Sequence, residues 1–142
     1  MSSNVWIAYT DGACRGNPGH SASGVHVISP HGQEFKFNKY TGQGTNNQSE
    51  YNALLLALEE LKKLGAEEIL LRADSELMVK QMRGEYKVKN PNIQPLFVKA
   101  ASLSKDFKKI SFEHVRRELN RVADHLANVA IDEHLQNFGA TT

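Results

Sequence analysis

The spacing of the apolar residues changes its period near residue 45, and this change constrains the fold more than any other feature. Before it, apolar and polar residues follow the patterns of strands over residues 5–10, 22–29 and 34–40. The turn residues at 29–32 (Ser-Pro-His-Gly) join the second and third of these segments. We therefore predict that the chain begins with an antiparallel meander.

Helical spacing follows from Asn47 to Leu64. Thr45-Asn46-Asn47 provides a start signal and Gly65 a stop signal. The apolar stripe of this helix consists of Tyr51, Leu54, Leu55, Leu58 and Leu61. A long helix with one apolar face is expected over these residues.

The second half of the chain alternates strands and helices. It contains a strand at 69–73, a helix at 75–82, a helix opened by Asn90-Pro91, a strand at 109–115 and a last helix from about residue 120. Strands that are joined through helices run parallel. The order β-β-β-α-β-α-α-β-α thus predicts an α/β fold, with a five-stranded mixed sheet flanked by helices.

Length and composition fit a single domain over residues 1–142. A chain of this size buries roughly 68 to 70% of the surface of its unfolded form, so its core needs no disulfide, and Cys14 is the one cysteine. The polar start at 1–4 lacks the features of a secretory signal, and no run approaches the ~20 apolar residues of a membrane span. We expect a cytoplasmic monomer with no membrane segment and no obligate protein partner.

The charge of the chain is nearly balanced, with 17 Lys and Arg against 16 Asp and Glu. This balance differs from that of proteins that coat nucleic acid. Four basic residues within 80–89 fit a solvated face and a phosphate track equally well. Three arginines within 116–121 lie close to Asp124, which favours nucleic-acid contact there.

Four acids occupy positions at which remote elements can meet. Asp11 and Asp74 follow apolar strand segments, whereas Glu50 and Asp124 open helices. Grouped carboxylates repel one another, and their oxygens are the hard ligands that Mg²⁺ or Mn²⁺ prefers. Because no zinc motif accompanies them, they favour hydrolysis of phosphate esters with two divalent cations.

Each acid also has a structural alternative. Asp74 could cap the helix that begins at Ser75, Glu50 and Asp124 could interact with helix dipoles, and Asp11 could stabilise a turn. Similarly, Gly16-Asn17-Pro18-Gly19 fits a tight turn better than a phosphate loop. Cys14 fits a small, partly buried residue better than a nucleophile.

Four segments together resemble type 1 ribonuclease H, in the order found in that family and across nearly the whole chain. They are Tyr-Thr-Asp-Gly-Ala-Cys-Arg-Gly-Asn-Pro-Gly at 9–19, Thr-Asn-Asn-Gln-Ser-Glu-Tyr-Asn-Ala at 45–53, Ala-Asp-Ser-Glu at 73–76 and Asn-Arg-Val-Ala-Asp-His-Leu-Ala at 120–127. The resemblance implies a ribonuclease H-like fold. It also implies endonucleolytic hydrolysis of the RNA strand of RNA–DNA hybrids, leaving 5′-phosphate and 3′-hydroxyl ends.

The resemblance also assigns roles to the acids. Asp11 would bridge two Mg²⁺ ions, with Mn²⁺ as a possible substitute. Asp124 would complete the site of the ion on the nucleophile side. Glu50 and Asp74 would hold the ion on the leaving-group side.

Further positions match those that contact substrate in the family. The positions that would meet RNA 2′-hydroxyls or nearby backbone, by which RNA is told from DNA, are Cys14, Asn17, Asn46, Asn47 and Glu76. Thr45 would help to hold a DNA phosphate. Many relatives carry a histidine in the loop before the last helix, where this chain has none; Arg117 is our candidate for its role.

Two other functions remain open at this stage. The chain could be a hybrid-binding module without turnover, which a missing acid would indicate, and none of the four is missing. It could also hydrolyse double-stranded RNA or DNA ends, which only a panel of duplexes would distinguish.

Overall fold

The computed structural model describes residues 4–139. It contains five strands and four α-helices in the predicted order, with an additional 3-10 helix η1 before the last α-helix. The strands are β1 (Val5–Gly16), β2 (Gly19–Ile28), β3 (Glu34–Gly44), β4 (Glu68–Ala73) and β5 (Lys109–His114). The helices are α1 (Asn46–Lys63), α2 (Glu76–Met82), α3 (Gln94–Ser104), η1 (Arg117–Leu119) and α4 (Arg121–Gly139).

The five strands form one mixed sheet in the order β3-β2-β1-β4-β5. β2 is antiparallel to both β1 and β3, whereas β1, β4 and β5 run parallel to one another. The predicted α/β class and the five-stranded mixed sheet are thereby confirmed. The extent of the single domain predicted over residues 1–142 stays a prediction.

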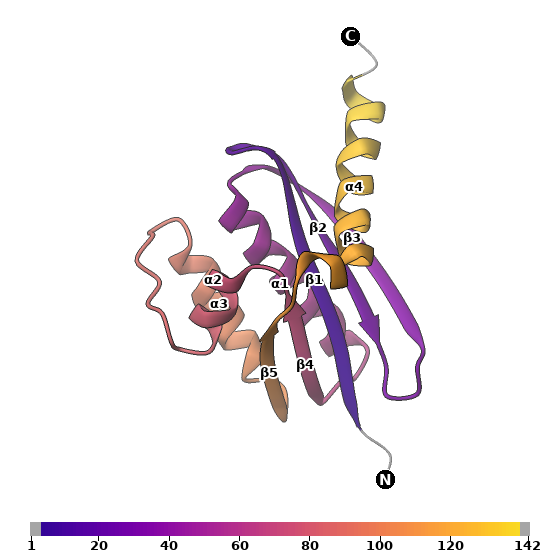
Figure 1. Ribbon diagram of the computed structural model, residues 1–142, viewed down its shortest axis with the longest axis vertical. Helices are drawn as coiled ribbons and strands as arrows, with labels where there is room; N and C mark the ends of the chain where they lie inside the picture. Colours follow the sequence, from indigo (N-terminus) through magenta and orange to yellow (C-terminus); the bar gives the residue numbers. More distant parts are fainter. Residues whose placement is uncertain (1–3, 140–142) are drawn as a thin grey trace.

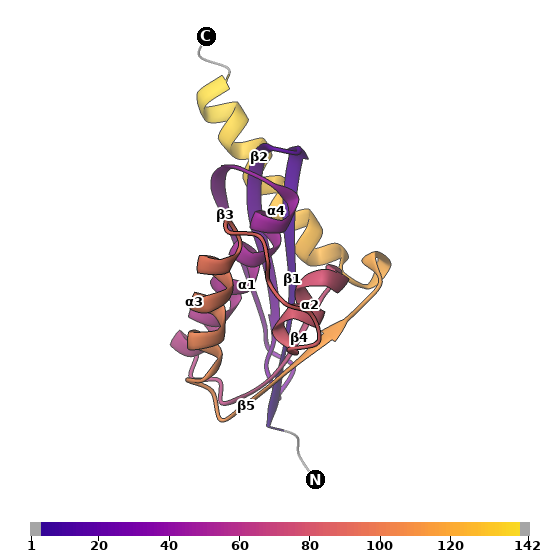
Figure 2. The same ribbon diagram turned by 90° about the vertical axis from the view of Figure 1, so that its left-hand side faces the viewer.

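Helices cover both faces of this sheet. α1 packs on β1 and β2, α3 packs against α1, and α4 packs on β1, β2 and β3. Figure 1 shows α4 extending past the end of the sheet, and Figure 2, close to an edge-on view, shows α1 and α3 together on one side. Two separate apolar clusters result, a large one beneath α1 and a small one beneath α4.

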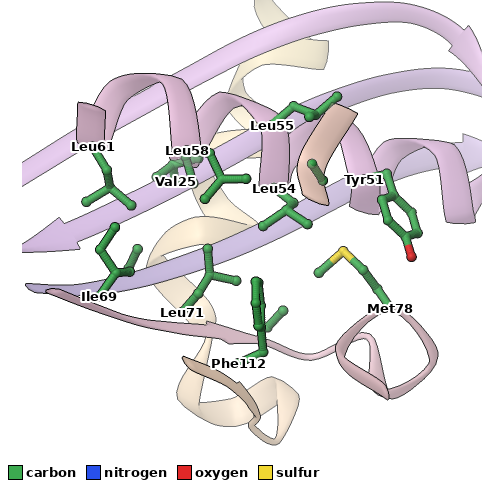
Figure 3. Packing of buried hydrophobic residues seen from close by; sticks show 14 of the residues in the cluster. Val25, Tyr51, Leu54, Leu55, Leu58, Leu61, Ile69, Leu71, Met78 and Phe112 are labelled. Carbon is green, nitrogen blue, oxygen red and sulfur yellow. The ribbon is translucent and has the colours of Figure 1, made fainter. Parts of the chain in front are cut away.

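The large cluster is built on the predicted apolar stripe of α1. Tyr51, Leu54, Leu58 and Leu61 are almost fully buried, and they face residues of β2, β4 and β5 such as Leu71 (Figure 3). Burial of one such side chain contributes about 1.5 to 3 kcal/mol. The core therefore fixes the position of α1 on the sheet, and with it the position of Glu50 on that helix.

The small cluster depends on close approach between α4 and β2 at Gly24. A Cβ atom at this position would lie 2.0 Å from the carbonyl oxygen of Ala123. Only the absence of a side chain lets the first turns of α4 rest on the strand.

We expect Gly24→Ala to force α4 away from the sheet and to lower the free energy of unfolding by about 1 to 3 kcal/mol, as overpacking typically does. Denaturant unfolding measures this change. Gly44→Ala is the matched control, because its Cβ would meet only side-chain atoms, the nearest at 3.3 Å. Equal stability of the two variants would contradict the interpretation of Gly24.

Three local predictions were wrong. β1 continues to Gly16 instead of ending before Asp11, because polar and glycine residues without apolar alternation still pair with β2. Asn90-Pro91 lies in a turn, and α3 begins at Gln94 with a proline in its first turn. Glu50 lies beyond the first turn of α1, which starts at Asn46.

Among residues 4–139, no helix combines the length and the apolar character needed to cross a membrane.

Candidate functional site

The acids meet where the parallel pairing of β1 ends. The pairing of β1 with β4 stops at Thr10 and Ala73, so Asp11 and Asp74 each directly follow the last paired residue of two neighbouring strands. β1 itself continues, paired only with β2. The termination of β4 at this point opens the sheet edge beside Asp11.

Glu50 reaches this edge from α1 because Gly12 has no side chain. A Cβ on Gly12 would lie 2.2 Å from the carbonyl carbon of Ser49. The backbone N–H of Gly12 instead donates to Glu50 Oε1 at 2.9 Å. This bond fixes one carboxylate oxygen beside Asp11.

Asn120 brings the start of α4 to the same place. Its side chain is 1% exposed, and Nδ2 donates to the carbonyl oxygen of Thr10 at 2.8 Å. Asp124 follows in the first turn of α4. The contact ties the helix to the residue directly before Asp11.

The carboxylates converge. Asp11, Glu50 and Asp74 each offer an oxygen within 4.8 Å of the others. Asp124 stands outside this group of three, but it lines the same cleft, and its charge is among those that raise the pKa of Asp11. The structure thus brings all four predicted acids together, with Asp11 in the middle.

The metal-free site holds protons that isolated carboxyls would release. Burial first, and then the charges of Glu50 and Asp74, raise the pKa of Asp11 to about 10. Burial and the charge of Asp74 raise the pKa of Glu50 to about 8. Ionising all of these carboxyls without a cation is therefore unfavourable, and a bound cation would offset their mutual repulsion.

The donor set fits a hard divalent cation. Glu50 Oε2 is buried and has no hydrogen-bond partner, although Oε1 is satisfied by Gly12. A buried carboxylate oxygen without a partner is costly unless an ion or water meets it. Carboxylates alone surround this point, which is the ligand type of Mg²⁺ and Mn²⁺.

The structural alternatives for three acids do not hold. Ser75, not Asp74, caps α2, since its hydroxyl accepts from the N–H of Met78. Asp11 lies within a strand rather than a turn. Glu50 is too far along α1 to act on its N-terminus.

The acids lie in a cleft of about 660 Å³. Of the other predicted site residues, Cys14, Asn46 and Arg117 line it. The cleft residues from the strand edges and from α1 are Asp11, Gly12, Ala13, Cys14, Arg15, Asn46, Glu50, Asp74, His114 and Val115, and those after β5 are Arg116, Arg117, Glu118, Asp124 and Asn128. Carboxylates and the guanidinium groups of Arg15, Arg116 and Arg117 therefore line the same cleft.

The remaining predicted contacts lie around the start of α1 and of α2, outside the lining of the cleft. Asn17 Oδ1 accepts from the N–H of Asn46 at 3.1 Å, which joins the β1–β2 turn to α1. The Thr45 hydroxyl caps α1 by accepting from Gln48. Asn47, the residue after Asn46 in α1, is exposed.

Glu76 and Cys14 also have partners within the protein. Glu76 is exposed and pairs with Lys80 at 2.7 Å, which lowers the pKa of Glu76. The Cys14 thiol lies 2.7 Å from the carbonyl oxygen of Gly16 and 3.2 Å from that of Gly44, so it acts as a local donor.

Three cleft residues were missed from the sequence. His114 was not singled out from the sequence, yet it lines the cleft and pairs in register with Ala73 at the same end of the parallel sheet. The rule that carboxyl ends of parallel strands share an edge could have found it. Asn128 lies one helical turn after Asp124, so helical periodicity could have found it, whereas Arg15 had no such signal.

The two basic groups differ in placement. Arg116 and Arg117 line the acid cleft, but Arg121 lines a separate hollow beneath α4. Within residues 80–89, Lys80 pairs with Glu76, and Arg83 donates to the carbonyl oxygen of Phe112. Neither of these two lines the cleft.

Comparison with known proteins places these features in a family context. Residues 9–130 match the family model described as "Reverse transcriptase-like". A bifunctional protein of Mycobacterium tuberculosis is 41% identical over 136 residues, which cover 94% of this chain and 37% of that protein. Ribonuclease HI of Halobacterium salinarum is 42% identical over 127 residues, which cover 89% of this chain and 64% of that protein.

Solved structures agree with these matches. The crystal structure of RNase H1 from Halobacterium salinarum superposes with a TM-score of 0.88 at 41% identity, covering 91% of this chain and 98% of the other. LC11-RNase H1, isolated from compost, was solved in complex with an RNA/DNA hybrid. It superposes with a TM-score of 0.87 at 42% identity, covering 92% of this chain and 99% of the other. The chain thus matches these solved chains almost end to end, but it spans little more than a third of the M. tuberculosis protein.

Proposed function

The chain belongs to the type 1 ribonuclease H family, and we propose on this basis that it is an endonuclease that hydrolyses the RNA strand of RNA–DNA hybrids. Two divalent cations would take part, and the products would carry 5′-phosphate and 3′-hydroxyl ends. The hybrid bound to the similar LC11-RNase H1 supports this choice of substrate.

One observation carries the proposal. Oxygens of Asp11, Glu50 and Asp74 lie within 4.8 Å of one another at a sheet edge, inside an open cleft. All four acids are present, which disfavours a binding module without turnover.

Mg²⁺ is the cation that we propose, with Mn²⁺ as a substitute. When bound, such ions supply an activated water and stabilise negative charge on the phosphate and the leaving oxygen. Asp11 would contact both ions and Asp124 the ion on the water side. Glu50 and Asp74 would hold the ion on the leaving-group side.

The chain's own groups would organise an in-line displacement. The oxygen of a water molecule forms a bond to phosphorus, the bond from phosphorus to the ribose 3′-oxygen breaks, and the water's protons end on solvent and on that oxygen. Gly12 holds Glu50 and Asn120 holds the start of α4, so these contacts keep the acids aligned during the reaction.

Recognition of RNA would come from the rim around α1. Asn46 and Asn47 are exposed at the start of the helix, and Asn17 is held beside them. Cys14 and Glu76 would meet neighbouring 2′-hydroxyls or backbone, and Thr45 a DNA phosphate. An ionised Glu76 can accept a hydrogen bond from a 2′-hydroxyl but cannot donate one. Its pairing with Lys80 lowers its pKa and so keeps the side chain ionised.

Arg117 is proposed to assist turnover, since it is exposed on η1 and lines the cleft with the acids. We expect Arg117→Ala to lower kcat by roughly 10-fold, equivalent to about 1.4 kcal/mol, with a smaller change in hybrid affinity. Steady-state kinetics and binding without divalent metal separate the two effects. An unchanged kcat would remove Arg117 from the mechanism.

Cleavage of end-labelled duplexes tests the proposal. RNA–DNA hybrid, double-stranded RNA and double-stranded DNA are each incubated with Mg²⁺, with Mn²⁺ or with EDTA. Internal cuts in the RNA of the hybrid, dependent on metal, are expected. Full activity in EDTA would refute the metal mechanism, and preferential cutting of either other duplex would change the substrate.

The proposed enzyme acts as a monomer in the cytoplasm, as one domain over residues 1–142. Sedimentation of the purified chain, alone and with hybrid, checks the monomer.

A further inference from the structure

A continuous set of polar contacts connects Asp124 to β1. Asn128 Nδ2 donates to the Asp124 backbone oxygen at 3.0 Å and to Asp124 Oδ1 at 3.2 Å. Asn128 Oδ1 accepts from Arg15 Nη2 at 3.1 Å. Arg15 Nη1 is paired with Asp132 Oδ1 at 2.7 Å. We infer that Asn128 and Arg15 are positioning residues that orient the Asp124 carboxylate for cation binding, an inference that rests on the proposed function.

The chemistry of the two partners fixes the direction of the Asn128 amide. An asparagine side chain has an acceptor on one side and two donors on the other, whereas a guanidinium can only donate. With its oxygen toward Arg15, the amide presents N–H groups to the Asp124 carboxylate. The reversed amide would set oxygen against oxygen at Asp124 and N–H against N–H at Arg15, so Arg15 selects the useful orientation.

Asp124 needs such an orienting contact more than Asp11 and Glu50 do. Glu50 is held by the Gly12 N–H, and Asp11 is 6% exposed within a strand. Asp124 lies on a helix outside the group of three acids, and Asn128 gives its carboxylate the one hydrogen bond from a neutral donor among the described contacts. Hydrogen bonds of this kind fix the orientation of ligating carboxylates and are worth about 10 to 100-fold in metal affinity or activity.

Arg15 also holds α4 in place. It contacts Asn128 and Asp132, which lie one turn apart, from a strand position 113 residues away from Asn128. The helix is thereby fixed to β1 at a second point beyond the Asn120 contact. A shift of α4 would move Asp124 away from Asp11, so this contact bears on the spacing of the acids.

Another possibility is that Arg15 serves only to bind a phosphate, since its side chain is 40% exposed in the cleft. That role predicts a loss of hybrid affinity that depends on salt, with unchanged metal binding. The positioning role predicts the reverse. Metal titration without nucleic acid therefore distinguishes the two.

The experiment uses the whole chain and Mn²⁺ as the probe. Calorimetric titration of Asn128→Ala, and of Asn128→Leu as a second variant of similar size, is compared with Gln136→Ala, an exposed position further along α4. We expect weaker Mn²⁺ binding by about 10-fold in both Asn128 variants, and an equal rise in the Mg²⁺ concentration for half-maximal cleavage. The KM for hybrid should stay within twofold of the starting protein, and circular dichroism confirms that the variants fold.

Arg15 is tested through Asn128. Arg15→Met should weaken Mn²⁺ binding, and Arg15→Lys should restore part of it because a donor to Asn128 Oδ1 returns. The double variant Arg15→Met with Asn128→Ala should lose less Mn²⁺ affinity than the sum of the two single losses, since the arginine acts in part through the amide.

Unchanged Mn²⁺ affinity in folded Asn128 variants would overturn the inference, as would additive losses in the double variant. If the starting protein binds Mn²⁺ and the Asn128 variants bind it more weakly, but none of the proteins cuts the hybrid, the inference stands while the proposed function fails. If hybrid is cut normally and the Asn128 variants bind Mn²⁺ normally, the inference alone fails.

Discussion

Asp11→Asn is expected to abolish hybrid cleavage while leaving the fold intact. Asp11 belongs to the group of three acids and also interacts with Asp124, so its loss would affect both proposed cations. Metal ions contribute several kcal/mol of charge stabilisation, and each factor of ten in rate corresponds to about 1.4 kcal/mol. We therefore expect kcat to fall by roughly 10³-fold or more.

The same substitution should not destabilise the metal-free protein. Asp11 is buried among acids that raise its pKa, and a neutral amide of the same shape removes that repulsion. Thermal unfolding in EDTA should give a Tm equal to or above that of the starting protein. Glu133→Gln, the same chemical change at an exposed site on α4, is the matched control and should keep full activity. A folded Asp11→Asn protein with substantial activity would contradict the bridging role.

The second large effect is a loss of stability of the metal-free protein as pH rises. The unfolded chain ionises Asp11 and Glu50 near their ordinary pKa values of 3.8 and 4.5, whereas the folded chain does so at about 10 and about 8. Between these limits the folded state binds more protons than the unfolded state. The contribution of these two carboxyls to stability is therefore complete below about pH 4, declines through neutral pH, and is lost above the folded pKa values.

Divalent cations should reverse this dependence. Mg²⁺ binds the ionised carboxylates, so raising the pH favours it over the protons, and the gain in stability on adding Mg²⁺ should grow from pH 5 to pH 9. For a chain of this size each kcal/mol corresponds to roughly 3 °C in Tm.

Thermal unfolding at several pH values, in EDTA and in Mg²⁺, measures both trends. The variant with Asp11→Asn and Glu50→Gln should show a flatter pH dependence in EDTA and little response to Mg²⁺. Glu34 and Glu76 do not interfere, because their pKa values are lowered and they titrate below this range. A Tm in EDTA that rises from pH 5 to pH 9, relative to the double variant, would contradict the placement of the two carboxyls.

Much of the fold was accessible from the sequence because local patterns report local structure. The helical stripe from Tyr51 to Leu61 predicted α1, a short apolar run predicted β4, and the alternation of apolar and polar residues predicted β5. The errors fell where neighbours decide the outcome. β1 continues past Asp11 because β2 pairs with it, and no apolar periodicity marks those residues.

For the site, the sequence determined which acids could act, and the tertiary structure decided how they meet. The residue types and their positions at strand ends and helix starts already pointed to Asp11, Glu50, Asp74 and Asp124 as cation ligands. Their separations depend on contacts between remote segments, such as Gly12 with α1 and Gly24 with α4. Only the folded packing creates these close approaches, the burial that raises two pKa values, and the link from Arg15 through Asn128 to Asp124.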